Sequence, residues 1–567
     1  MKKSTLRFFA LVLSLTLLTA VLSGCSLLRA IGNAVWNTGI SFEDLKYEDY
    51  DMTAFNELCD EISKLLDDNA DSDVILSKMD DLSIKRAEIY SMYSLATIYN
   101  AIDVTDEKYA DAVVSSYEKS LKADDDFSVL ARRVTESDCA DAAREYWGDE
   151  AFEYYSTYEP MTQEDNEFHT REQELINEYN NVLASDISVT YNGVTVSYSN
   201  ISSLGLNEEE YYEALALVQD AYKKECGEIF ARLVSLRCDY FGRDNYAPAM
   251  YQGYMRDYTT NDANRLYDDV KKYAVPLYAS LSTEQNNNDI YEFLTSSNGL
   301  ADASLLSKLG GKLGAMSDDF SEAFNFMKRR GYYNVGYSEK KMQASFTSLI
   351  YGYNVPFLFI QPALTSADIF TFVHEFGHYN AMFHSPLAEC DLDLTEIPSS
   401  ALELLFCERN PDVFGKHFES ARLFSASQML SSLIVGCMIN EFETEIYSER
   451  MTDIDDIDEL FIRLCAEYGV AEFSWAEVPH LFMYPFYYIS YSVSALSAMD
   501  IWLSSCEDFD SAFKKYMLIA AEDGSRSCRE AVKAAGVMSI FDDNAIRLTV
   551  ERLENILEVT EEAKAAA

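Results

Sequence analysis

The sequence predicts a mainly α-helical protein, and two observations support this fold class. Most of the 567-residue chain consists of segments in which apolar residues recur at helical spacing, and the composition is globular, with 48% hydrophobic residues and only 10 prolines. Strand-like runs occur in two short regions, residues 188–197 and 344–361. We therefore expect long helices with a little β-structure around a large core.

The N-terminus has the pattern of an export signal. A basic segment ends at Arg7, an apolar run continues to Leu22, and Ser-Gly-Cys25 follows. The apolar run is too short for a comfortable membrane span, which favours a signal peptide. The ending resembles a bacterial lipoprotein signal, which implies cleavage before Cys25 and a diacylglycerol on its sulfur. Residues 1–24 are then the signal peptide and residues 25–45 a tether.

This signal predicts an extracytoplasmic protein that is anchored by lipid to the bacterial cell membrane rather than spanning it. An ordinary secretory signal or an uncleaved anchor are the alternatives. The formal net charge of −50 argues against nucleic acid as a partner and against electrostatic adhesion to anionic lipid. It is typical of a solvated acidic surface. Ten cysteines follow Cys25 without a C-x-x-C pair, so we expect buried thiols, although disulfides stay possible. The sequence does not indicate an oligomeric state.

The middle of the chain supplies the expected elements. Residues 188–197 alternate and carry Asn192-Gly193 at their centre, which predicts a β-hairpin. We place a domain boundary near residue 186, with an N-terminal helical region at residues 46–185. Short strands are expected at 344–351 and 355–361, around Gly352. Helices are expected at residues 55–66, 84–102, 167–183, 208–240, 260–280, 319–330 and 512–557.

A further helix is expected immediately after these strands. Thr365 and Asp368 form a T-x-x-D start signal, apolar residues follow, and Ser385-Pro386 ends the segment. This helix contains His374-Glu375-Phe-Gly-His378, an H-E-x-x-H pattern. Two histidines four residues apart leave the same helical face, so both imidazoles can reach one Zn²⁺ at about 2.0–2.1 Å. Glu375 projects beside them, where a carboxylate can take a proton from water.

A catalytic zinc site uses three protein ligands, so a third is expected on a separate element. Glu396 lies 18 residues beyond His378, and Glu403 follows seven residues later. Seven residues are nearly two helical turns, so the two carboxylates share a face. The stretch Glu396-Ile-Pro-Ser-Ser-Ala-Leu-Glu403 therefore offers acidic groups at a suitable distance along the chain.

At these residues the sequence resembles the family of thimet oligopeptidase and oligoendopeptidase F. The resemblance implies that His374, His378 and Glu396 hold one zinc ion, that Glu375 is the general base, and that Glu403 orients a ligand. It implies two helical halves flanking a deep active-site channel, with a small β-sheet next to the H-E-x-x-H helix. It also makes residues 186–567 the catalytic region and the hairpin its boundary.

A zinc site also needs donors for the developing oxyanion, and residues 480–491 offer them. Tyr484, Tyr488 and Tyr491 follow at i, i+4 and i+7, which predicts one helical face, and a neutral phenol can donate a hydrogen bond. The family has a histidine followed by tyrosines at similar spacing. The resemblance therefore implies that His480 and Tyr488 bind substrate, with Tyr484 and Tyr491 next and Tyr487 possible.

The predicted function is that of a zinc-dependent metallo-oligopeptidase that hydrolyses internal bonds of short peptides. One alternative is a related helical zinc carboxypeptidase, which needs a cation for the substrate's terminal carboxylate. Arg409 and Arg422 are the available candidates. Another alternative is a peptide-binding lipoprotein, which needs no Glu375. Zinc content and the effect of Glu375→Gln on turnover distinguish an enzyme from a binding protein.

Overall fold

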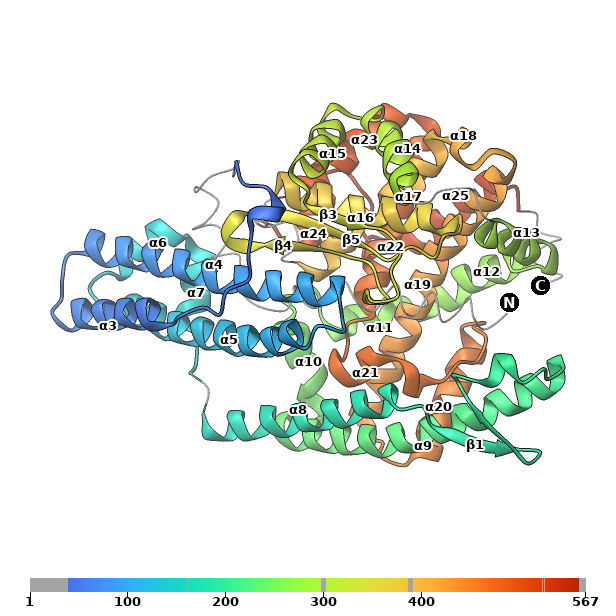
Figure 1. Ribbon diagram of the computed structural model, residues 1–567, viewed down its shortest axis with the longest axis horizontal. Helices are drawn as coiled ribbons and strands as arrows, with labels where there is room; N and C mark the ends of the chain where they lie inside the picture. Colours follow the sequence, from blue (N-terminus) through green and yellow to red (C-terminus); the bar gives the residue numbers. More distant parts are fainter. Residues whose placement is uncertain are drawn as a thin grey trace. The chain divides into compact units, whose positions relative to one another are not determined.

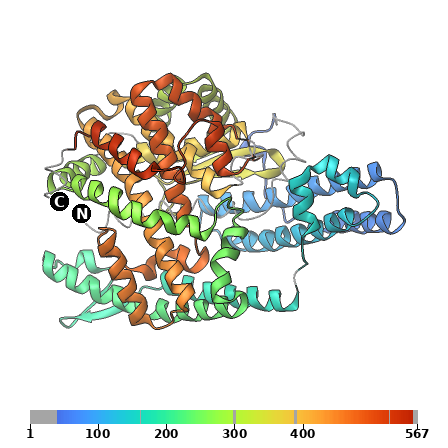
Figure 2. The same cartoon turned by 180° about the vertical axis from the view of Figure 1, so that it is seen from behind.

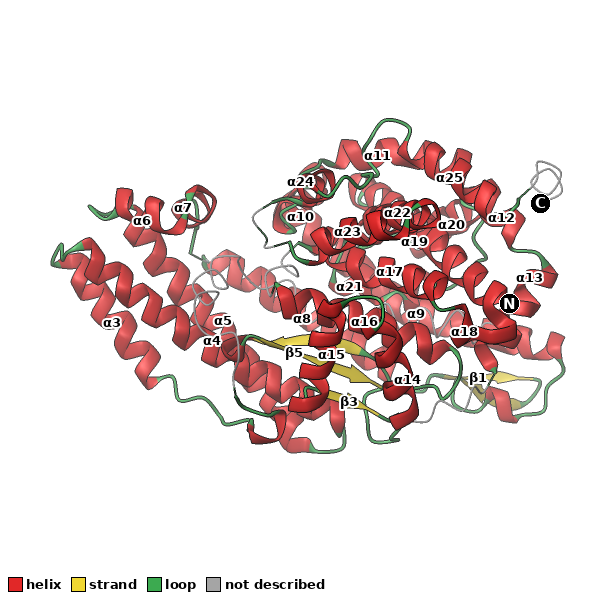
Figure 3. Ribbon diagram, turned by 90° about the horizontal axis from the view of Figure 1, so that it is seen from above, coloured by secondary structure: helices red, strands yellow, loops and turns green. Residues whose placement is uncertain are grey.

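The computed structural model describes residues 39–160, 162–296, 302–385, 391–522, 524 and 526–559. The predicted signal peptide, Cys25 and the predicted helix stop at Pro386 lie outside these residues. The described chain is mainly helical with two small sheets, as Figures 1 and 3 show, which confirms the predicted fold class. The last residues of the predicted tether are packed, because Leu45 is buried and the Phe42 ring lies 4.3 Å from that of Phe357.

The chain divides into two compact units, each assembled from three stretches of sequence. Unit 1 comprises Met1–Pro160, Glu284–Ala426 and Ala498–Val537, and unit 2 comprises Met161–Thr283, Ser427–Ser497 and Met538–Ala567. These units are defined by packing between segments, and the boundary near residue 186 stays a prediction. Sequence periodicity identifies a helix but not the helix on which it packs.

Unit 2 contains α8 (Gln163–Ala184) and α9 (Glu208–Phe241), which run side by side (Figures 1 and 2). Ion pairs from Arg232 to Glu178 at 2.5 Å and from Arg237 to Glu172 at 2.7 Å join these helices. The predicted hairpin is present between them. Strands β1 (Ser188–Tyr191) and β2 (Val194–Ser197) pair antiparallel, and both turn residues have positive φ, as a type I′ turn requires. The other helices of unit 2 include α10 (Arg243–Gly253), α11 (Thr260–Asp269), α12 (Val275–Leu281), α20 (Ile454–Glu467), α21 (Pro479–Met483) and α25 (Ala545–Ile556).

Two helices, α19 (Phe418–Glu449) and α22 (Ile489–Glu507), contribute residues to both units. The helical segment Pro411–Glu449, which includes α19, is long and apolar enough to cross a membrane by length and composition. Its most apolar window is 67% buried inside the protein, which is the property of a core helix.

The N-terminal part of unit 1 is a helical bundle of α3 (Thr53–Asp67), α4 (Ser72–Ile102) and α5 (Glu107–Thr135). Asp71 and Asp106 begin α4 and α5, because each carboxylate accepts a backbone N–H two residues later. The core of the bundle is continuous and apolar, with Phe55, Ile62, Met79, Leu82, Ile89, Phe127, Leu130 and Val134 among its members. The short helices α6 (Ala140–Trp147) and α7 (Asp149–Ser156) complete it.

The rest of unit 1 contains a three-stranded sheet with the order β3-β5-β4, on which α16 (Ala367–His384) packs. Strand β4 (Phe346–Ile350) pairs antiparallel with β5 (Val355–Ile360), which confirms the two predicted strands. Every residue of both strands is buried, which explains their continuous apolar character. The sequence did not indicate β3 (Tyr333–Val335), which pairs parallel with β5. The helices here are α13 (Glu284–Thr295), α14 (Asp302–Gly314), α15 (Asp318–Arg330), α16 (Ala367–His384), α17 (Leu392–Arg409), α18 (Pro411–Phe414), α23 (Phe509–Ala520) and α24 (Cys528–Ala534).

The nine cysteines within the described residues are free thiols. Seven are buried, Cys59 is half-buried and Cys506 is exposed. Burial in the helical core raises the pKa of the Cys437 thiol to about 12, so this group behaves as an apolar side chain.

Candidate metal centre and catalytic site

Helix α16 carries the H-E-x-x-H residues, and its first turn is fixed by Asp368. The carboxylate of Asp368 reaches back and accepts the backbone N–H groups of Ala363 at 2.7 Å and Thr365 at 3.1 Å. Burial raises the pKa of Asp368 to about 6, against the opposing effect of these N–H donors. The helix ends at His384, next to the predicted stop at Ser385, so its position was correctly predicted.

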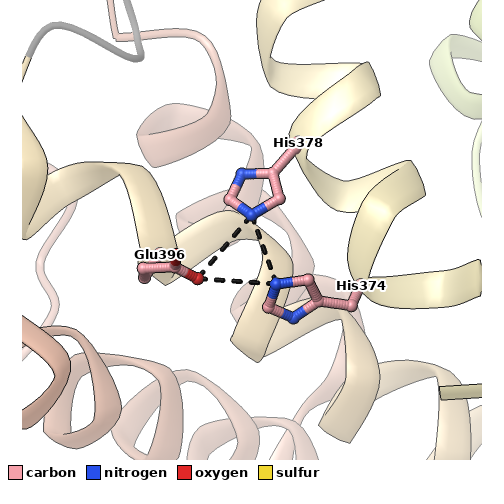
Figure 4. A group of neighbouring side chains, drawn as sticks. All are labelled: His374, His378 and Glu396. Carbon is pink, nitrogen blue, oxygen red and sulfur yellow. Dashed lines mark hydrogen bonds and ion pairs between the residues drawn. The ribbon is translucent and has the colours of Figure 1, made fainter. Parts of the chain in front are cut away.

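His374, His378 and Glu396 point toward one another from α16 and α17 (Figure 4). The Nε2 atoms of the two histidines are 3.3 Å apart. The Glu396 Oε2 lies 3.5 Å from His374 Nε2 and 3.6 Å from His378 Nε2. Three ligand atoms around a tetrahedral zinc ion, each at about 2.0–2.1 Å, are spaced by about 3.4 Å. The donor set and its spacing therefore fit a zinc ion.

The two helices that supply these ligands approach closely at Gly377. A Cβ atom at this position would lie 2.6 Å from the Cα of Ser399 and 3.0 Å from the carbonyl oxygen of Pro398. A residue without a side chain is therefore needed between the two histidines. This close approach brings a ligand on α17 within reach of ligands on α16.

Hydrogen bonds with two neighbouring side chains, Glu403 and Ser399, orient the ligands. The Glu403 Oε1 lies 2.7 Å from His374 Nδ1, so that nitrogen donates to the carboxylate and the Nε2 lone pair faces Glu396 and His378. Burial lowers the pKa of His374, but the hydrogen bond and the charges of Glu403 and Glu396 outweigh it and raise that pKa. The Ser399 hydroxyl lies 3.1 Å from both the carbonyl oxygen and the Oε2 of Glu396.

Glu375 is buried, with 1% of its surface exposed, and it lies beside Thr347 of strand β4. The Thr347 hydroxyl is 3.0 Å from Glu375 Oε2 and 2.9 Å from the Glu375 carbonyl oxygen. Burial raises the pKa of Glu375, whereas the neighbouring histidines and this hydroxyl oppose the rise. The sheet therefore contributes directly to the surroundings of the predicted general base.

The predicted oxyanion donors form a cluster in unit 2. The His480 ring centroid lies 6.0 Å from that of Tyr484, 5.3 Å from Tyr487, 5.0 Å from Tyr488 and 6.3 Å from Tyr491. His480 is 2% exposed, and burial lowers its pKa to about 3, so the imidazole is neutral. Burial also raises the pKa of Tyr488.

Contrary to the sequence prediction, these tyrosines do not lie on one face of a single helix. Helix α21 ends at Met483 and α22 begins at Ile489, and Phe486 between them has a φ of +64°. A turn, rather than one helix, therefore brings the tyrosines around His480. His374, His378 and Glu396 belong to unit 1 and the His480 cluster to unit 2, and each group converges within its own unit.

Sequence reasoning missed two hydroxyl groups of the site. Ser399 lies within the Glu396-Ile-Pro-Ser sequence, so its position three residues after a ligand on one helix was an available signal. Thr347 gave no such signal, because the contact joins a strand to a helix 28 residues later.

Two family models match this chain. Residues 42–158 match the peptidase M3 N-terminal domain, and residues 318–547, which contain the ligands and the His480 cluster, match peptidase family M3. No curated protein sequence matched the chain.

Solved structures show the same fold. An X-ray structure of a protein described as oligoendopeptidase F has a TM-score of 0.74 and 22% identity, covering 93% of this chain and 100% of that one. PZ peptidase A with an inhibitor has a TM-score of 0.74, 19% identity and coverage of 92% and 100%. A protein from Bacillus anthracis described as oligoendopeptidase F has a TM-score of 0.74, 20% identity and coverage of 93% and 100%. With both parts of the family matched, the chain belongs to peptidase family M3 and is a metallopeptidase.

Proposed function

We propose that this protein is a zinc-dependent oligopeptidase that hydrolyses internal bonds of short peptides outside the cytoplasm. The observation that carries the proposal is the group formed by His374, His378 and Glu396, whose ligand atoms all lie within 4.8 Å of one another. Two neutral imidazole nitrogens and one carboxylate are the donors of many catalytic zinc sites, and they leave a position for water.

The chemistry divides between the metal and the chain. When bound, zinc lowers the pKa of a coordinated water molecule and polarises the peptide carbonyl. Glu375 Oε2 would accept a proton from the attacking water and return it to the leaving amine, and its burial favours a carboxylate able to hold that proton. Glu403 keeps the His374 ring in the tautomer that presents Nε2 to the metal.

We assign the residues of the His480 cluster the role of hydrogen-bond donors to the oxyanion in the proposed reaction. A neutral imidazole and neutral phenols can donate hydrogen bonds to a developing oxyanion without adding a charge that competes with the metal. Our assignment of His480 and Tyr488 to this role, with Tyr484 and Tyr491 next, rests on the resemblance and on their convergence. Tyr487 is an equal candidate for this role, because the distance from its ring to that of His480 lies within the range of the distances for these tyrosines.

The substrate class follows from the family resemblance, which implies a channel that excludes folded proteins. The carboxypeptidase alternative needs a cation for a terminal carboxylate, and both of its candidates have other contacts. Arg422 donates to Glu408 at 3.0 Å, and the Arg409 guanidinium lies 5.0 Å from the centre of the Phe509 ring. These contacts favour internal cleavage.

The location rests on the N-terminal sequence, which supports export and a lipid anchor at Cys25. Metabolic labelling with a clickable fatty acid tests this part directly. We expect label on the wild-type chain and none on Cys25→Ala, with the wild type in the membrane fraction. Equal labelling of both proteins would contradict the anchor.

Mass spectrometry of a mixed oligopeptide pool tests the activity. Residues 26–567 would be incubated with the pool, and Glu375→Gln would serve as the blank. We expect internal cuts confined to short peptides. Stepwise loss of C-terminal residues would favour the carboxypeptidase, and no cleavage by zinc-loaded protein would favour a peptide-binding lipoprotein.

A further inference from the structure

The turn between α21 and α22 leaves buried backbone groups outside any helix. Phe486 is 0% exposed and Tyr487 is 2% exposed, so water cannot serve all of these groups. Buried N–H and C=O groups need partners, and here several partners are side chains from other helices of unit 2. We call these side chains the framework, because they hydrogen-bond the backbone that carries the His480 cluster.

Arg237 of α9 holds the short helix α21, which directly precedes this turn. Its guanidinium is 0% exposed and donates to the carbonyl oxygens of Leu481 at 3.3 Å and Phe482 at 2.5 Å. The Glu172 carboxylate accepts from its Nε at 2.7 Å, which balances the buried charge. The two carbonyls follow His480 immediately, so Arg237 fixes the end of the short helix that carries His480.

Glu443 of α19 holds the turn itself. Its Oε1 accepts the backbone N–H of Phe486 at 2.8 Å, and Phe486 is the residue with a φ of +64°. A bulky residue in this conformation persists only where its surroundings determine it. The Phe486 ring is enclosed by Tyr447, Tyr246 and Tyr251, with ring centroids 5.6, 6.0 and 6.0 Å away.

The environment of Glu443 is unusual for a group with a packing role alone. Its side chain is 1% exposed, and among the described residues Oε2 has no hydrogen-bond partner. Burial raises its pKa to about 8, although the Phe486 N–H, Arg237 and Arg256 oppose the rise. Its Oε1 accepts from Phe486, the left-handed residue between Tyr484 and Tyr488.

Two further contacts complete the framework. The Tyr254 hydroxyl donates to the carbonyl oxygen of Pro485 at 3.1 Å, directly before the residue that Glu443 holds. Arg256 donates to the Ser490 hydroxyl at 2.8 Å in the first turn of α22. Side chains from other parts of unit 2 thus hold two carbonyls of α21, the Pro485 carbonyl and the Phe486 N–H of the turn, and the Ser490 side chain of α22.

We propose that Glu443, Tyr254 and Arg237 are positioning residues that hold the turn at Phe486, and the short helix before it, in the conformation that gathers the tyrosines around His480. None of the three is assigned a contact with substrate. The inference rests on the proposed function, because it assigns these residues to the geometry of the oxyanion donors.

The test compares Glu443→Leu, which removes the acceptor, with Glu443→Gln, which keeps it. Glu441→Gln is the matched control, since Glu441 lies on the same helix but contacts Lys271 and Tyr468. Three quantities are measured: zinc affinity by competition with a chromophoric chelator, kcat and KM on a cleaved peptide, and the titration of His480. NMR of histidine-labelled protein gives that titration, assigned with His480→Gln among six histidines.

We expect Glu443→Leu to lower kcat by about 10- to 100-fold, because misplaced donors weaken transition-state stabilisation, with zinc affinity unchanged. Its His480 should titrate closer to the ordinary pKa of about 6.5, because a loosened turn admits water. Glu443→Gln and Glu441→Gln should match the wild type in both respects. Wild-type kcat and wild-type His480 titration in folded Glu443→Leu would overturn the proposal.

A milder variant keeps the test decisive if Glu443→Leu does not fold. Tyr254→Phe removes only the hydroxyl that donates to Pro485, and it should lower kcat several-fold and shift the His480 titration in the same direction. No change in either quantity would overturn the proposal. If the zinc-loaded wild type cleaves no peptide, the proposed function fails, whereas the His480 titration still supports or overturns the positioning role.

Discussion

The Thr347 hydroxyl lies 3.0 Å from Glu375 Oε2, so a strand of the small sheet touches the carboxylate that is the candidate general base. Both groups are buried, with exposed fractions of 4% and 1%. A hydroxyl at this distance fixes the carboxylate's orientation without contributing a charge. The contact connects the fold of unit 1 to the chemistry proposed for it.

Thr347→Val is therefore expected to lower kcat about 10-fold at full zinc loading, because a hydrogen bond to a charged group is worth about 1.5–3 kcal/mol. Thr347→Ser keeps the hydroxyl and should stay close to the wild type. Steady-state kinetics at matched zinc content checks this. An equal loss in both variants would show that the methyl group, not the hydroxyl, is what matters.

Removing the carboxylate that orients His374 should weaken metal binding. Glu403 Oε1 accepts from His374 Nδ1 at 2.7 Å, and loss of such a partner typically costs 10- to 100-fold in metal affinity or activity. We expect Glu403→Ala to show that loss in a chelator competition, and Glu403→Gln, which keeps an acceptor, to show a smaller one. Zinc affinity of Glu403→Ala equal to that of the wild type would contradict this role.

The close approach of α16 and α17 predicts that Gly377 cannot carry a side chain. In Gly377→Ala the added methyl would lie 2.6 Å from the Ser399 Cα, so we expect a loss of about 1–3 kcal/mol of stability and weaker zinc binding. Gly311→Ala is the control, because nothing lies within 4 Å of a Cβ there and helix propensity favours alanine. Chemical denaturation compares the two, and equal stabilities would refute the packing argument.

The burial of the Glu443 carboxyl group predicts that the free energy of unfolding depends on pH. Burial raises its pKa from 4.5 to about 8 in the folded protein, so the unfolded chain loses this proton first as pH rises. Stability from this group is present below about pH 4.5 and falls between about pH 5 and 8. Glu443→Gln cannot ionise, so it should gain more than about 1.4 kcal/mol over the wild type between pH 5 and pH 8. Parallel stability curves for the two proteins would show that Glu443 titrates normally.

The metal-binding helices could be predicted because their signals are local. Thr365, Asp368 and Ser385 indicated the bounds of α16, and the spacing of Glu396 and Glu403 placed both on one helical face. The structure brings both carboxylates to His374. Spacing along one helix is fixed by helical geometry alone, so this part needs no knowledge of tertiary packing.

Other features depend on contacts that periodicity does not encode. The tyrosine spacing suggested one helix, but Pro485 disfavours helix at Tyr484, and Glu443 holds Phe486 in a left-handed conformation. The hairpin at Asn192-Gly193 was predicted from local turn chemistry, whereas the pairing of α8 with α9 was not. The contact between Thr347 and Glu375 likewise exists only once the sheet packs on α16.

The most direct test of the proposed mechanism is the turnover of zinc-loaded Glu375→Gln beside the wild type at equal metal content. Glutamine keeps the shape of the side chain but cannot accept the proton, and general-base catalysis contributes about 10²–10⁴-fold. We expect Glu375→Gln to bind zinc as the wild type does and to lose at least about 100-fold in kcat. Turnover equal to that of the wild type at full zinc loading would contradict the assignment of Glu375 and the proposed mechanism.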